Sequence, residues 1–141
     1  MELDELSGLE ILQKVINGEI KASMDETIPI KLEHAERGSV IGTVIPGIEH
    51  LSLRRGVHPA FHSSALAIIT NYAFQTMIGK GVKFYPIDLN AKILSLIPIN
   101  KELFIEGKVI FIEDHFGVAE GYIKDQEGFM FAHATATFYI Q

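Results

Sequence analysis

The chain has 141 residues, 48% hydrophobic and 21% charged, a composition typical of one folded globular domain spanning residues 1–141. The sequence contains no cysteine, which excludes disulfides, thiolate metal sites and cysteine nucleophiles. Twelve basic and eighteen acidic residues give a net charge of −6, and the basic residues are scattered, so we expect no nucleic-acid partner.

The first five residues, Met1-Glu2-Leu3-Asp4-Glu5, are acidic where a secretory signal would be basic, which favours a cytoplasmic protein. Residues 3–18 predict an amphipathic helix that ends at Gly18, because their leucines recur near one helical face. Residues 28–34 alternate between apolar and charged side chains. Arg37-Gly38 then predicts a turn, and residues 39–45 are again extended, so this region is expected to form a β-hairpin.

Residues 46–59 are rich in turn residues and predict a loop that leads into a helix over residues 62–78. This helix has no charged face, so it must be enclosed by other parts of the protein. The apolar stretch 61–79 is close to the length of a membrane span. It contains six Ser, Thr, Asn and Gln residues and is followed at once by strand-like segments, so we expect a buried helix and no membrane insertion.

Four segments with strand character follow, at residues 84–96, 102–113, 115–124 and 129–140. The last one places small residues on its inner face, where a helix could pack closely, and His133 on its outer surface. The element order predicts an α+β fold in which a curved antiparallel β-sheet of about five to six strands wraps one long central helix, with an additional N-terminal helix. Two such units are expected to pair, because one sheet cannot cover both the helix and its own edges.

The same order and several local strings resemble the hotdog-fold thioesterases, in particular the PaaI-like (phenylacetate-degradation) branch. The C-terminal half carries the strongest resemblance, and His62-Ser63-Ser64 falls where that family has His-Gly-Gly at the start of the central helix. The strings that follow the family pattern are Ile87-Asp88-Leu89-Asn90, Glu106-Gly107-Lys108-Val109, Val118-Ala119-Glu120-Gly121 and Ala132-His133-Ala134-Thr135-Ala136-Thr137-Phe138.

This resemblance implies a homodimer or homotetramer that holds an acyl-CoA thioester at a subunit interface, with no other cofactor. The first turn of the central helix would then polarise the thioester carbonyl at Ser63 and Ser64 through backbone N–H groups and the helix dipole. Asn71 stands where relatives carry the acidic residue that acts as base or nucleophile. Because His62 and Asn71 are roughly 13 Å apart along a helix, the site would combine residues from two subunits.

Several residues depart from the family pattern where the chemistry would take place. Asn71 has a neutral amide, which can orient a water molecule but cannot accept a proton. It is therefore interpreted either as a water-positioning group or as a buried amide that crosses the dimer and does no chemistry. Ser63 and Ser64 replace two glycines, and Pro86 replaces a common Ser or Thr.

Four further residues are candidates for binding the substrate. Arg54 and Arg55 could meet the phosphates of CoA, although a solvated pair in a loop is the common alternative. Tyr72 could line an apolar acyl tunnel or simply pack in the core. Asp88 shares a strand face with Pro86 in a regular strand, where it could replace the missing carboxylate or serve as a structural residue.

The remaining candidates have structural alternatives that we favour. His62 is expected to shape the helix start rather than act as general base. Ser63 and Ser64 lack the Gly-x-Ser-x-Gly pattern of a nucleophile, so a capping role is favoured. His58 and His62 have a spacing found in metal sites, but Pro59 lies between them and no third ligand is evident, so no metal is expected.

Three functional hypotheses follow. The first is an acyl-CoA thioesterase with weak activity, in which Asn71, His62, Ser63 and Ser64 form the catalytic group. The alternative is a non-catalytic protein that binds acyl-CoA or a fatty-acyl group. The third is a purely structural dimerisation domain without a ligand cleft.

Overall fold

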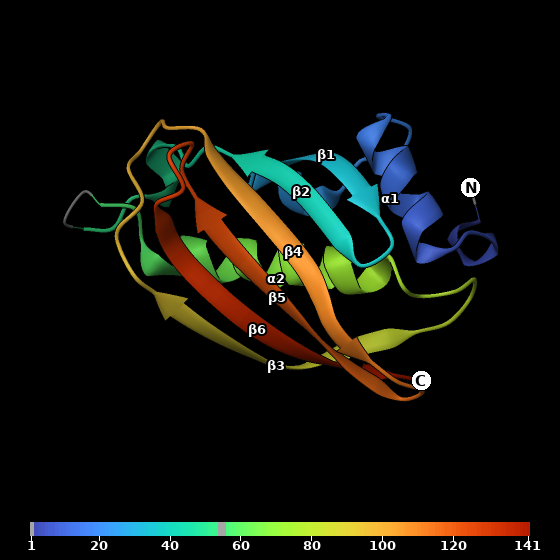
Figure 1. Cartoon of the computed structure of the whole chain (residues 1–141). Helices are drawn as coiled ribbons and strands as arrows, with labels where there is room; N and C mark the ends of the chain where they lie inside the picture. The colour runs from blue at the N-terminus through green and yellow to red at the C-terminus, as the bar shows by residue number, and fades with distance from the viewer. Residues whose placement is uncertain (1, 54–55) are drawn as a thin grey trace.

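The computed structural model describes residues 2–53 and 56–141. The described residues form two α-helices and six strands, preceded or joined by short 3₁₀ turns, and Figure 1 shows their arrangement. In chain order the elements are η1 (Leu3–Glu5), α1 (Gly8–Ile16), η2 (Ser23–Glu26), β1 (Ile30–Glu36), β2 (Ser39–Val44), η3 (Ile48–His50), α2 (Pro59–Gln75), β3 (Phe84–Ile93), β4 (Leu103–Ile112), β5 (Phe116–Lys124) and β6 (Met130–Ile140).

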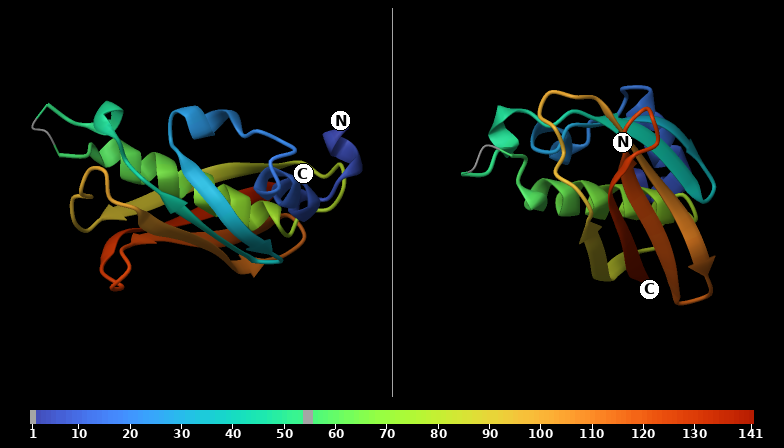
Figure 2. Two further views of the ribbon diagram at one scale, coloured as in Figure 1. Left: turned by 90° about the horizontal axis from the view of Figure 1, so that it is seen from above. Right: turned by 60° about the vertical axis from the view of Figure 1, so that its left-hand side comes forward.

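The six strands form one antiparallel sheet in the order β1-β2-β4-β5-β6-β3. The sheet curves around α2, which lies along its concave side, while α1 lies beside the β1–β2 hairpin (Figure 2). This arrangement confirms the predicted hotdog fold, including the hairpin at Arg37-Gly38 and the four C-terminal strands. The β1 and β3 strands are the two edges of the sheet.

The N-terminal helix is shorter than predicted because Ser7 caps it. The Ser7 hydroxyl accepts a hydrogen bond from the Glu10 N–H at 3.2 Å, and the Glu10 carboxylate accepts one from the Ser7 N–H at 2.9 Å. This reciprocal cap fixes the helix start at Gly8, so residues 3–5 form a separate 3₁₀ turn. The helix ends before Gly18, whose φ of 81° a residue with a side chain rarely adopts.

Both ends of α2 lie three residues earlier than predicted. His58 is the N-cap residue, and its Nδ1 accepts a hydrogen bond from the Ala60 N–H at 2.9 Å. Pro59 occupies the first helical position, where the absence of an N–H costs nothing. At the other end the Thr76 hydroxyl donates to the Ala73 carbonyl at 2.6 Å and accepts from the Gly38 N–H at 2.7 Å, which ties the helix end to the β1–β2 turn.

Small residues let α2 pack closely against the sheet. A Cβ atom at Gly107 would lie 2.6 Å from the Ile69 carbonyl oxygen, and one at Gly121 would lie 2.9 Å from an Ile69 methyl group. The predicted inner-face alanines of β6 are also at most 2% exposed: Ala132, Ala134 and Ala136. Leu66, Ile69 and Phe74 are 0% exposed, and burial of each contributes about 1.5–3 kcal/mol.

The sheet covers only one side of α2, so the predicted enclosure of this helix is incomplete within one chain. Ala67 is exposed, and Ile68 and Asn71 are half-buried. The neighbouring edge strand β3 is also open, with Ile87 61% exposed and Leu89 38% exposed. An unpartnered strip with largely apolar side chains therefore runs along α2 and β3.

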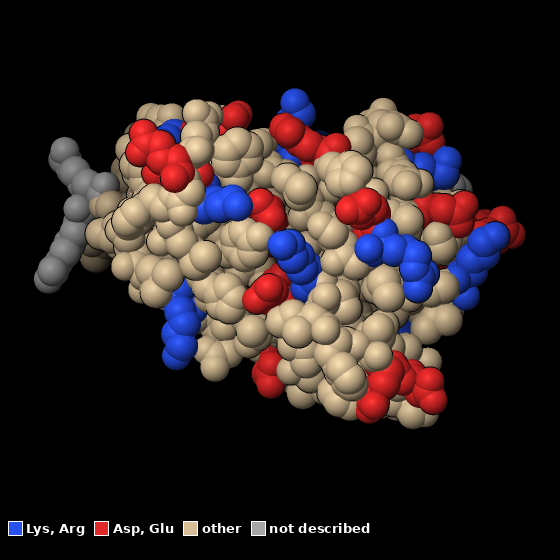
Figure 3. Space-filling view, in the orientation of Figure 1, with Lys and Arg blue, Asp and Glu red and all other residues tan. Residues whose placement is uncertain are grey.

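The outer face of the sheet carries acidic and basic side chains side by side (Figure 3). On this face Glu106 accepts hydrogen bonds from Tyr122 at 2.7 Å and from Lys124, whose Nζ lies 3.0 Å away. Burial and the hydrogen bond to Glu106 raise the pKa of Tyr122 to about 12. His133 points outward, as predicted, and lies 3.1 Å from the Glu120 carboxylate. Among the described residues, no helix is long and apolar enough to cross a membrane.

We predict that Gly107→Ala destabilises the protein by about 1–3 kcal/mol, because the added methyl group must displace α2 from the sheet. Gly79→Ala is the matched control, since a Cβ atom there has no neighbour closer than 4.0 Å. Urea unfolding at one fixed protein concentration compares the two variants. Equal stability of both variants would contradict the proposed packing constraint.

Candidate functional site

The candidate residues on α2 fall into two groups within one protomer. Ser63 and Ser64 lie near the helix start, whereas Asn71 and Tyr72 lie about two turns further along. Ser64 lines one pocket of about 290 Å³, and Asn71 and Tyr72 line another of about 340 Å³. A single chain therefore does not bring the predicted catalytic residues together.

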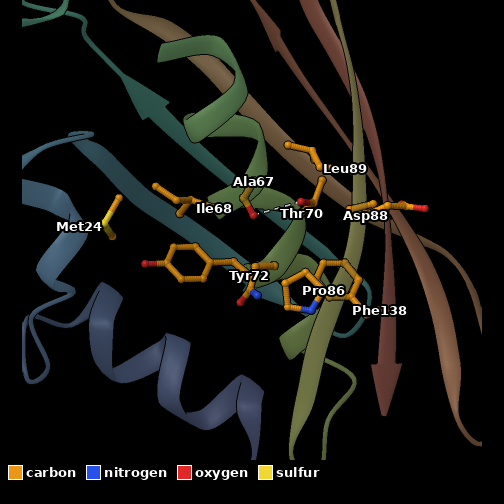
Figure 4. Close-up of a pocket in the computed structure, with 11 residues that line it drawn as sticks. Met24, Ala67, Ile68, Thr70, Tyr72, Pro86, Asp88, Leu89 and Phe138 are labelled. Atoms are coloured by element: carbon orange, nitrogen blue, oxygen red, sulfur yellow. Dashed lines mark hydrogen bonds between the residues drawn. The ribbon is translucent and has the colours of Figure 1, made fainter. Parts of the chain in front are cut away.

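The Asn71 pocket lies between α2, β3, β6 and the η2 turn (Figure 4). Its walls are mostly apolar, and Thr70 turns its hydroxyl back to the Leu66 carbonyl at 2.7 Å. The side-chain amide of the half-buried Asn71 makes no hydrogen bond to any described residue, so it is free to bind a ligand or water. The lining residues are Met24, Ala67, Ile68, Thr70, Asn71, Tyr72, Pro86, Asp88, Leu89, Ala136 and Phe138.

Tyr72 contributes an aromatic wall to this pocket, and its hydroxyl points toward the side where Met24 lies (Figure 4). Burial raises the pKa of the Tyr72 phenol, and the negative charge of Asp25 raises it further. The phenol is therefore neutral near pH 7. Burial also raises the pKa of the Asp25 carboxyl, an effect that Lys21 opposes.

The expectation that Asp88 shares a strand face with Pro86 is wrong. The β3–β6 register shifts at a β-bulge between these residues, so Pro86 pairs with the inward-facing Phe138 and Asp88 pairs with Thr137. The Asp88 carboxylate points away from the pocket (Figure 4) and accepts a hydrogen bond from the Thr137 N–H at 3.2 Å. It is not placed to replace a missing carboxylate at Asn71 of its own chain.

The predicted arrangement at the start of α2 also needs correction. Because α2 begins at Pro59, Ser63 and Ser64 lie in its second turn, where backbone N–H groups bond within the helix. The N–H groups of the first turn are also occupied, since Ala60 donates to the His58 ring and Phe61 to the His58 carbonyl at 2.8 Å. An oxyanion hole of unpaired N–H groups at Ser63 and Ser64 is therefore wrong.

The favoured capping role of the two serines is wrong for the same reason, because His58 caps the helix. Ser63 and Ser64 are half-buried, and their hydroxyls make no hydrogen bonds to other described side chains or backbone groups. Both hydroxyls remain available as donors. Ser64 lines its pocket together with His50, His58 and Phe61.

His62 is completely buried at the start of α2. Its Nε2 lies 3.1 Å from the Ser95 carbonyl oxygen, and its Nδ1 has no hydrogen-bond partner among the described residues. Burial lowers the pKa of the imidazole, although the carbonyl groups of Ser95 and His58 act in the opposite direction. These contacts favour the structural interpretation, in which neutral His62 connects α2 to the segment after β3.

The other candidates are placed as follows. Arg54 and Arg55 lie outside the described residues. The Nδ1 atom of His58 is used in the helix cap, and the described part of the chain holds no group of three or more His, Asp or Glu residues arranged for a metal ion.

The capping role of His58 and the place of Met24 in the Asn71 pocket were not predicted from the sequence. His58 followed by Pro59 was a usable signal for the helix cap, because proline favours the first helical position. Met24 had no such signal, since it reaches the pocket from a short turn far away along the chain.

No family model matches the sequence, and no curated protein matches it. Its structure is similar to that of zebrafish thioesterase superfamily member 2, with a TM-score of 0.79 and 13% identity over 94% of this chain and 98% of that one. A hypothetical thioesterase from Streptococcus pneumoniae with coenzyme A gives a TM-score of 0.73 and 18% identity over 79% and 85% of the two chains. A Streptococcus mutans protein bound to acetyl-CoA gives a TM-score of 0.75 and 17% identity over 87% of this chain and 94% of that one. At these identities the similarity establishes a shared fold.

We predict that His62 makes the protein less stable in mild acid. Because its pKa is lowered in the folded state, the unfolded chain takes up the proton first as the pH falls below 6.5, and stability is lost. Unfolding measured between about pH 7.5 and 5.5 should therefore show a smaller loss for His62→Gln than for the wild type. His115→Gln, at an exposed position, controls for the number of histidines. Parallel pH profiles for wild type and His62→Gln would contradict the assignment.

Proposed function

We propose that the protein is a homodimer that binds an acyl-CoA thioester at its subunit interface and hydrolyses it slowly. The observation that carries this proposal is the unpartnered Asn71 amide in an otherwise largely apolar pocket beside the open β3 edge. Similarity in fold to a thioesterase superfamily member, to a hypothetical thioesterase with coenzyme A and to a protein bound to acetyl-CoA supports the choice of ligand.

The open strip along α2 and β3 supports pairing with a second copy. An exposed strand edge offers backbone hydrogen-bonding groups to another strand, and a two-fold axis presents the same surface on both subunits. Two antiparallel α2 helices that cross at Ala67 would bring Ser63 of one subunit opposite Asn71 of the other, because Ala67 lies midway between them. Ala67 is small and exposed, as such a crossing point requires.

In this dimer each site combines the α2 start of one subunit with the Asn71 pocket of its partner. The thioester carbonyl accepts a hydrogen bond from the free Ser63 or Ser64 hydroxyl. Its acyl group occupies the apolar Asn71 pocket. This geometry also accounts for the separation within one chain of Ser63 and Ser64 from Asn71, which is roughly 10–12 Å along the helix.

Hydrolysis then proceeds by attack of water on the thioester carbon. The Asn71 Oδ1 accepts a hydrogen bond from the water and orients its lone pair toward the carbonyl. The carbon–sulfur bond breaks, the proton released by the water passes through solvent to the departing thiolate, and the products are a carboxylic acid and CoA. Because Asn71 cannot take the proton itself, the reaction is slow.

Binding without hydrolysis is the second candidate function. The specific observation in its favour is the absence of a carboxylate at Asn71, together with the occupied N–H groups in the first turn of α2. The ligand and the site are the same in both cases. The two functions differ in whether bound acyl-CoA releases its thiol.

We predict that Asn71→Asp raises the rate of thiol release from acyl-CoA by about tenfold or more, because a carboxylate can accept the proton from the attacking water. Asn71→Ala should lower the rate, and Asn17→Asp, on the exposed C-terminus of α1, controls for the change from amide to acid. Release of free CoA from short, medium, long and aromatic acyl-CoAs provides the measurement. Saturable binding without thiol release by either the wild type or Asn71→Asp would favour the non-catalytic function.

We also predict that two inactive variants complement each other. Mixed dimers of Ser63→Ala/Ser64→Ala protein with Asn71→Ala protein contain one site with all native side chains if the site is shared between subunits. Subunit exchange should therefore restore up to about a quarter of the wild-type rate. Activity that stays at the level of the two separate variants would contradict a shared site.

A further inference from the structure

Met24 occupies an unusual place in the Asn71 pocket. Every other lining residue belongs to α2, β3 or β6, whereas Met24 belongs to the η2 turn. Figure 4 shows Met24 beside Ile68 and the Tyr72 hydroxyl, on the side of the pocket opposite Pro86 and Phe138. Ile68 and Asn71 are three residues apart on α2 and therefore share a helix face, so the path from Asn71 past Ile68 ends at Met24.

The backbone around Met24 is fixed by hydrogen bonds, whereas Met24 itself is partly exposed to solvent. Ile28, which is 6% exposed, donates its N–H to the Met24 carbonyl at 2.8 Å, and the Thr27 carbonyl lies 2.6 Å from Nε2 of the buried His50. Met24 is nevertheless 48% exposed. A substitution at this position should therefore reshape the end of the pocket without removing a core contact.

The charges around the pocket restrict what it can accept. Among the described residues that line it there is no Lys, Arg or His, and the acidic Asp25 follows Met24 directly. A carboxylate at the far end of an acyl group would lie against a lining without a positive group and close to the negative charge of Asp25. Lys21, whose charge acts on Asp25, does not line the pocket, so this placement is unfavourable.

We propose that Met24 closes the acyl pocket and sets the length of the acyl group, and that this pocket selects uncharged apolar acyl groups over those with a terminal carboxylate. This inference rests on the proposed acyl-CoA function, because it assigns the Asn71 pocket to the acyl group. It identifies the η2 turn as the element that determines specificity.

The test measures binding by calorimetry and thiol release for straight-chain acyl-CoAs of increasing length. Met24→Ala removes three heavy atoms and should extend the preferred acyl group by about two methylene groups, with a gain of roughly tenfold for that longer substrate. Met24→Trp should shorten the preferred acyl group. Met130→Ala is the matched control, since Met130 is 38% exposed on β6 and does not line the pocket.

Butyryl-CoA and succinyl-CoA test the charge selection, because both acyl groups have four carbons and only one carries a carboxylate. We expect the wild type to bind butyryl-CoA at least about tenfold more tightly. Unchanged length profiles in both Met24 variants, or equal binding of the two C4 thioesters, would overturn this inference alone. Because calorimetry detects binding without hydrolysis, a length shift in binding without thiol release would support the inference and count against hydrolysis. No acyl-CoA binding by the wild type would overturn both.

Discussion

The close approach of α2 to the concave face of the sheet is the constraint on which the rest of the structure depends. Gly107 and Gly121 leave no space for a Cβ atom beneath Ile69, and the alanines of β6 extend the same shallow surface. One side of the apolar helix α2 can therefore pack closely against the sheet. The opposite side of the helix remains open, and with it the groove in which the Asn71 pocket forms.

Because α2 is buried on one side only, its open side and the free edge of the sheet lie next to each other. The open side of α2 lies next to β3, an edge strand that pairs, among the described strands, with β6 alone. In the proposed dimer, each protomer contributes Ser63 and Ser64 to one site and Asn71 to the other, and the exposed β3 edge lies beside both groups. A second copy would pair with the sheet edge and complete the site through one interface, because a two-fold axis repeats every interaction.

The sequence predicted the fold well because its signals are local and repeated. Alternation identifies each strand, and the small inner residues of β6 indicate a close helix. The site was harder to predict. The sequence pattern predicted that the helix starts at His62, but His58 and Pro59 set that start earlier through a local cap. A β-bulge turns the Asp88 side chain to the other face of the sheet, which the alternation of apolar and polar residues does not reveal. Met24 reaches the pocket only through the tertiary fold.

Sedimentation equilibrium shows whether a second copy covers α2 and β3 in solution. Ala67→Glu places a charge at the proposed crossing point of the two helices, where it would be buried beside its own symmetry mate. Gln13→Glu adds the same charge to an exposed position of α1. We predict a dimer for the wild type and for Gln13→Glu, and a monomer for Ala67→Glu. A monomeric wild type, or a dimer that Ala67→Glu leaves unchanged, would contradict this prediction.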